Sequence, residues 1–85
     1  MPYRIEFSPR ADRDFDALPR DVKERVQSRI DALAMTPRPS GVEKLAGEAG
    51  MYRVRSGTYR IIYEIHDRVL LVVLLKIRHR REAYR

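Results

Sequence analysis

The 85-residue chain contains no cysteine and no tryptophan, and it has only four glycines, two phenylalanines and two histidines. The lack of cysteine excludes a disulfide framework, a thiol nucleophile and a cysteine-ligated zinc site. Two histidines are too few for the usual structural zinc site, so neither a metal nor a cofactor is expected. The longest apolar run, residues 69–75, is much shorter than the roughly 20 residues of a membrane helix. Residues 1–7 lack the apolar core of a signal peptide, so we expect a cytoplasmic protein without membrane contact.

Positive charge is concentrated in the last part of the chain. The chain has 18 lysines and arginines against 12 acids, which gives a net charge of +6. Residues 1–52 contain equal numbers of bases and acids, so the whole excess lies in residues 53–85, where eight of the nine bases are arginine. Arginine presents a planar fork of donors that matches phosphate, so nucleic acid is the partner that this asymmetry suggests. The alternative is a solvated basic face that only keeps the protein soluble.

The first half of the sequence predicts one strand followed by a helical hairpin. Residues 3–7 alternate between apolar and charged side chains, as in a short strand. Ser8 and Pro9 form a typical helix start, and Pro19 ends this short helix and can begin a second one. The second helix has its apolar positions three or four residues apart, and these are Val22, Val26, Ile30 and Leu33. The turn-forming residues 36–41 then stop this helix.

The second half predicts three strands over residues 51–55, 58–65 and 69–78, separated by short turns. The predicted order is therefore β-α-α-β-β-β in a single domain, residues 1–85. We expect an α+β fold, in which the helical hairpin packs on one face of a twisted, mainly antiparallel four-stranded sheet.

Alternation along these strands sorts the basic residues to one face. In the last strand the odd-numbered residues are expected to continue the apolar face, and Leu70, Val72 and Leu74 to lie on the less covered one. Six bases are expected to gather on the face away from the helices: Arg53, Arg55, Arg60, Lys76, Arg78 and Arg80.

Such a patch has few chemical options. The sequence has no glycine-rich phosphate loop, no paired carboxylates and no Ser/His/Asp arrangement. RNA cleavage needs neither a metal nor a cofactor, because the ribose 2′-hydroxyl is itself the nucleophile. Arginine can stabilise the charge that develops on phosphorus but cannot accept a proton. The candidate proton carriers are therefore Tyr84, His79 and Lys76.

Three segments, taken in order, carry a family resemblance: Lys44-Leu45-x-Gly47, residues 52–63 reading YRVRSGTYRIIY, and His79-Arg80-x-x-x-Tyr84. Together they resemble the RelE family of the RelE/ParE superfamily of type II toxin–antitoxin toxins. The resemblance implies a RelE-like fold and a ribosome-dependent, metal-independent mRNA endonuclease. Such a toxin cleaves mRNA in the ribosomal A site by attack of the 2′-hydroxyl on the adjacent phosphate, which inhibits translation.

The same resemblance implies roles for individual residues. Arg60, Arg80 and Tyr84 would be catalytic, and His79 is a candidate proton carrier. The RNA-binding residues would be Arg53, Arg55, Lys76, Arg78 and Lys44. Some active family members have lysine at the positions of Arg53 and Arg55. Since arginine cannot act as a base, this difference gives more weight to Tyr84 or His79.

A cognate antitoxin is also implied, with an acidic, partly disordered segment that folds on binding to give a hetero-oligomer. Two other functions remain open from the sequence. One is a ParE-like inhibitor of DNA gyrase on the same fold without nuclease activity. The other is a toxin homologue that has lost activity and serves as a binding partner or regulator. Arg53 and Arg55 could also only solubilise an exposed sheet face, and Tyr84 could only pack near the end of the chain.

Overall fold

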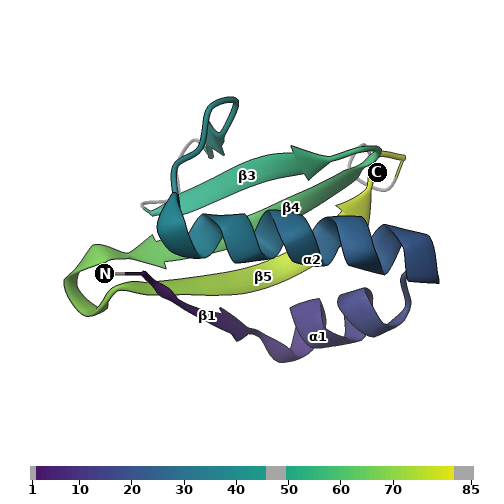
Figure 1. The fold of residues 1–85 in the computed structure, drawn as a ribbon, viewed down its shortest axis with the longest axis horizontal. Helices are drawn as coiled ribbons and strands as arrows, with labels where there is room; N and C mark the ends of the chain where they lie inside the picture. Colours follow the sequence, from purple (N-terminus) through teal and green to yellow (C-terminus); the bar gives the residue numbers. More distant parts are fainter. Residues whose placement is uncertain (1, 46–49, 82–85) are drawn as a thin grey trace.

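The computed structural model describes residues 2–45 and 50–81, which form two α-helices packed on one mixed sheet (Figure 1). The elements follow the chain in this order: β1 (Arg4–Phe7), α1 (Pro9–Asp16), α2 (Arg20–Met35), β2 (Glu43–Lys44), β3 (Met51–Ser56), β4 (Tyr59–His66), the 3₁₀ turn η1 (Asp67–Val69) and β5 (Leu71–His79). The strand order is β1-β5-β4-β3-β2, in which β1 runs parallel to β5 and every other pair is antiparallel. The predicted α+β class and helical hairpin are confirmed. The described sheet has five strands rather than four, because the two-residue β2 is too short to show an alternating pattern.

The two helices cover the same face of the sheet, and α2 lies across its centre (Figure 1). The apolar positions predicted for α2, Val22, Val26, Ile30 and Leu33, are all buried. They join the inward-facing residues of the strands in one core, among them Val54, Ile61 and Tyr63. Neither helix in the described ranges has the length and apolar character needed to cross a membrane.

Helix α1 is fixed to β5 at both of its ends. Ser8 caps the helix, because its Oγ accepts a hydrogen bond from the Ala11 amide at 3.0 Å and donates one to the Leu75 carbonyl at 2.9 Å. Near the other end, a carboxylate oxygen of Asp14 accepts a hydrogen bond from the Ile77 amide at 3.1 Å. These contacts hold the carboxyl-terminal half of β5 in place from the helical side.

The predicted face assignment of β5 is wrong for its first half. Val72 and Leu74 are fully buried in the core and do not lie on the less covered face. The register explains the error: Ile62 pairs with Lys76 but Tyr63 pairs with Leu74, so Leu75 is an extra residue in a β-bulge. A bulge exchanges the two faces for the residues that follow it, which is why Ile77 is buried on the same side as Leu74.

The connection between β4 and β5 is also longer than predicted. The strand expected to begin at residue 69 begins at Leu71, because η1 and Leu70 form the turn. Leu70 adopts a left-handed conformation with φ of 51°. Val69 and Leu70 are exposed in this turn, so they do not extend the core.

A polar cluster ties this turn to the start of the chain and to the loop after α2. The Arg38 guanidinium donates to both carboxylate oxygens of Asp67, at 3.2 and 2.9 Å, and to the Tyr52 hydroxyl at 3.1 Å. The Tyr3 hydroxyl donates to Asp67 at 2.6 Å. These hydrogen bonds, that of Arg38 first, lower the pKa of Asp67 to about 2. The loop is fixed further by Tyr63, whose hydroxyl donates to the Pro37 carbonyl at 2.8 Å.

This cluster predicts a specific dependence of stability on pH. Because the folded pKa of Asp67 is about 2 and its ordinary value is 3.8, its contribution is complete above that ordinary value and is lost as the pH falls through 2. Asp67→Asn should therefore lower the melting temperature at neutral pH, and the difference from the parent should close as the pH approaches 2. Thermal unfolding followed by circular dichroism over this pH range measures the difference. Glu24→Gln, which removes an exposed carboxylate of α2, is the control; equal melting temperatures for Asp67→Asn and the parent at all pH values would contradict the prediction.

Candidate functional site

The face of the sheet opposite the helices carries rows of positively charged side chains. In one row, Arg55 pairs with Arg60 and Arg60 with Arg78, across β3, β4 and β5. In the next row, Arg53 and Lys76 lie on either side of Ile62. Residues paired directly across a sheet share a face, so five of the six predicted bases lie together on this one. Like charges in such positions repel one another, and an anion bound among them removes that cost.

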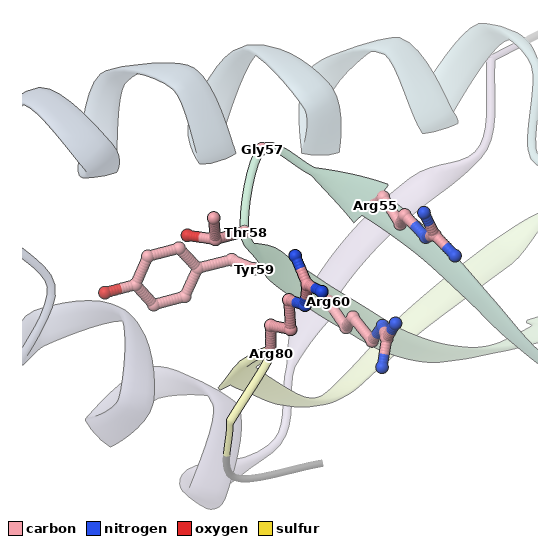
Figure 2. Close-up of a pocket in the computed structure, with 6 residues that line it drawn as sticks. All are labelled: Arg55, Gly57, Thr58, Tyr59, Arg60 and Arg80. Atoms are coloured by element: carbon pink, nitrogen blue, oxygen red, sulfur yellow. The ribbon is translucent and has the colours of Figure 1, made fainter. Parts of the chain in front are cut away.

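The sixth base, Arg80, joins this row at the end of the sheet. A cavity of about 190 Å³ lies there, lined by Arg55, Gly57, Thr58, Tyr59, Arg60 and Arg80. The Arg80 amide donates to the Thr58 carbonyl at 2.6 Å, which fixes the end of β5 beside the β3–β4 turn. Gly57 adopts φ of 60° in that turn, a conformation that favours glycine. Figure 2 shows the side chains of Arg60 and Arg80 extending to the same side of the sheet, and Tyr59 pointing the other way.

The arginines of this face differ in how they are held. Arg60 is buried, with 7% of its surface exposed, whereas Arg55 and Arg80 are exposed. Arg53 forms an ion pair with Glu43, with Nη2 and Oε2 2.6 Å apart. The Arg53 hydrogen bond, followed by the charges of Arg53, Arg55 and Arg60, lowers the pKa of Glu43. The Glu43 carboxylate therefore interacts electrostatically with three arginines of the face.

Two donors on this face lack acceptors. Among the residues that the structure describes, Arg53 Nε and Arg78 Nε are buried without a hydrogen-bond partner. Buried polar groups in native proteins are nearly always satisfied by protein groups, water or a bound ion, so both donors are available to an acceptor on this face. Both donors lie among positive charges, so an oxyanion is the acceptor that fits.

The structure does not bring all the predicted site residues together. His79 faces the helical side, where its ring packs edge-on against Tyr59 with 5.1 Å between centroids, and its Nδ1 accepts a hydrogen bond from the Arg81 amide. It lines a cavity of about 170 Å³ together with Asp14, Ala17, Leu18, Tyr59 and Ile77, and a second cavity together with Thr58, Arg80 and Arg81. Lys44 pairs with Tyr52, a core residue, and so lies on the other face from Arg53. Tyr84 lies outside the described residues.

Sequence reasoning missed Glu43, Gly57 and Thr58 as neighbours of the arginines. Gly57 and Thr58 could have been found, because a hairpin turn between two arginine-bearing strands must lie beside those arginines. Glu43 had no such signal, since its position depends on the short strand β2.

Within the described ranges no group of three or more histidines, cysteines or acids could hold a metal ion. The guanidinium groups of the arginine face can bind an oxyanion and stabilise negative charge, but they cannot transfer protons.

Fold and site together define a small α+β protein with a continuous face of arginines that ends in a cavity. The family described as "ParE toxin of type II toxin-antitoxin system, parDE" matches residues 5–84. The chain thus belongs to this family of toxins, within the RelE/ParE superfamily that the sequence motifs predicted.

The individual relatives agree with this assignment. Toxin RelG of Mycobacterium tuberculosis is 36% identical over 86 residues, covering 100% of this chain and 99% of the relative. The mRNA interferase toxin RelE of Escherichia coli K12 is 28% identical, covering 99% of this chain and 92% of the relative. Among solved structures, a chain of the toxin–antitoxin complex RelBE2 from M. tuberculosis superposes with a TM-score of 0.83 and 34% identity, covering 94% of this chain and 100% of that one.

Proposed function

We propose that this toxin is a ribosome-dependent endoribonuclease that cleaves mRNA in the A site and so inhibits translation. The observation that carries the proposal is the row Arg55–Arg60–Arg78, with Arg80 beside the cavity at its end. The similarity of the chain to a protein named an mRNA interferase supports the choice of RNA as substrate. The site of action would be the cytoplasm, where translating ribosomes are found.

The proposed reaction uses groups of the RNA itself. The 2′-oxygen bonds to the adjacent phosphorus, and the bond from phosphorus to the 5′-oxygen of the next nucleotide breaks. One proton leaves the 2′-hydroxyl and one reaches the departing 5′-oxygen. Arg60 and Arg80 stabilise the additional negative charge on the phosphoryl oxygens, and the burial of Arg60 strengthens its electrostatic effect. Arg53, Arg55, Lys76 and Arg78 bind the neighbouring phosphates.

The proton carrier is the remaining role. Arginine cannot fill it, and His79 points to the helical side of the sheet. Tyr84 is therefore our preferred candidate, because it is the tyrosine of the His79-Arg80-x-x-x-Tyr84 segment that resembles the RelE family.

Replacing Tyr84 by phenylalanine tests this role, because the change removes only the hydroxyl. We expect the single-turnover cleavage rate on ribosome-bound mRNA to fall by about 10²-fold, the lower range for loss of an acid–base group. Affinity for the ribosome should stay near that of the parent. His79→Ala serves as the comparison and should cleave near the parent rate. Normal cleavage by the phenylalanine variant would show that Tyr84 has only a packing or stacking role.

The partner that would restrain this activity is a cognate antitoxin. Similarity to a chain from a toxin–antitoxin complex supports this partner. A net charge of +6 suits an acidic, partly disordered segment that folds on binding. The product of a neighbouring gene, when co-expressed, should co-purify with the toxin as a hetero-oligomer and block its activity.

Primer extension on mRNA bound to programmed ribosomes tests the activity directly, alongside a gyrase supercoiling assay. We expect cleavage within the A-site codon, little cleavage of free RNA and no effect on supercoiling. Inhibition of supercoiling without RNA cleavage would replace the proposal with the gyrase-directed function. Growth inhibition with neither effect would exclude both.

A further inference from the structure

The ion pair between Glu43 and Arg53 sits at the edge of the arginine face. Glu43 is paired with Arg53 across β2 and β3, so both side chains project to the same side as Arg55 and Arg60. The 2.6 Å contact between Oε2 and Nη2 places a carboxylate oxygen on one donor of the guanidinium fork, and phosphate oxygens bind donors of the same kind. Arg53 Nε stays buried and unpaired among the described residues, so the carboxylate satisfies only part of the guanidinium fork.

Within the described ranges, none of Arg55, Arg78 and Arg80 forms an ion pair with a carboxylate. Glu64 shares the face through its pairing with Met51, but its contact is with His66, at 3.3 Å. Both glutamates are partly exposed, and both can be replaced by glutamine with the same change in net charge. Glu64→Gln is therefore a control for the loss of charge that Glu43→Gln causes.

We propose that Glu43 is a specificity-determining residue, which occupies Arg53 until a correctly placed RNA phosphate displaces it. This inference rests on the proposed function, since it assigns Arg53 to the RNA backbone. A phosphate that binds Arg53 must break an existing ion pair, so its net gain is smaller than at an unoccupied arginine. RNA that is free in solution then binds weakly, whereas RNA held by the ribosome supplies the remaining binding energy. A contact that weakens binding to unwanted partners is a recognised source of specificity.

The salt dependence of binding gives a direct readout of this competition. Each cation that is newly neutralised by a single strand contributes about −0.7 to the slope of log K against log salt concentration. In the parent protein Arg53 is already neutralised by Glu43, so it contributes little to this slope. After Glu43→Gln, Arg53 should add its full contribution.

The experiment measures the binding of a single-stranded DNA oligonucleotide, which lacks the 2′-hydroxyl and cannot be cleaved, at a series of salt concentrations. Glu43→Gln should tighten binding at low salt by about fivefold, a factor equivalent to an exposed ion pair at the upper end of its usual range. It should also steepen the slope by about 0.7. Glu64→Gln, with the same net charge, should change both quantities much less. Equal effects of the two substitutions would overturn the proposal, and weaker binding by Glu43→Gln would show that Glu43 positions Arg53 instead of competing for it.

A double-mutant cycle separates this inference from the proposed function. When Arg53 is replaced by glutamine, Glu43→Gln should have a much smaller effect than in the parent, because the competed cation is gone and only the charges of Arg55 and Arg60 remain near Glu43. An effect in that background as large as in the parent would contradict the proposal. For Glu43→Gln, the rate of free-RNA cleavage should rise relative to that of ribosome-bound mRNA, whereas Glu64→Gln should leave this ratio unchanged. If no variant cleaves mRNA but the binding contrast holds, the proposed function fails and the competition at Arg53 stands.

Discussion

Replacing Arg60 by alanine is expected to slow the cleavage of ribosome-bound mRNA by about 100-fold or more. This is the typical loss when one group that stabilises transition-state charge is removed. Substrate affinity should fall less, because the other cations of the face still bind the backbone. Single-turnover rates, measured at saturating toxin, separate the two effects. Arg68→Ala removes the same charge from an exposed position in η1, and it should cleave at the parent rate.

Two further variants keep this test informative if Arg60→Ala folds poorly, since Arg60 is buried. Arg80 is exposed at the end of β5, so Arg80→Ala should keep the parent melting temperature while losing activity to a similar degree. Arg60→Lys keeps the charge but not the planar fork, and it should recover only part of the rate. Full cleavage by both Arg80→Ala and Arg60→Lys would mean that the arginines serve only to bind.

The largest effect on stability is expected from Leu74→Ala. Leu74 has no exposed surface and belongs to the core beneath the helices. Truncating a buried leucine costs about 2–5 kcal/mol in free energy of unfolding. Leu71→Ala, on the same strand but the opposite face and only partly buried, should cost about half as much or less. Urea denaturation at neutral pH measures both, and equal losses would contradict the face assignment that follows from the bulge.

The sequence predicted those elements whose periodicity is strong. Helix α2 shows its apolar stripe at every turn, and β3 alternates cleanly between Arg53 and Val54, so both the elements and their faces follow from local pattern. The placement of Arg53, Arg55 and Arg60 on one face followed from the same alternation.

The errors arose where local pattern carries no information. Residues 69–75 are all apolar, so either set of alternate residues could have faced the core, and the bulge at Leu75 left no trace in the sequence. Strand β2 consists of two residues whose pairing is imposed by β3. The ion pair between Glu43 and Arg53 depends on that pairing, so the most distinctive contact of the site could be found only in three dimensions.

The parallel pairing of β1 with β5 has a consequence for how the protein is made. Arg4 pairs with Leu71 and Phe7 with Leu74, so the first of the described strands along the chain lies beside the last of them. Helix α1 is bonded to β5 as well, through Ser8 and Asp14. Contacts between distant parts of a chain form late in folding, because the intervening loop must close first. A chain that stops before residue 71 would leave β1 and α1 without their partner strand, so the sheet can be completed only after β5 has been synthesised.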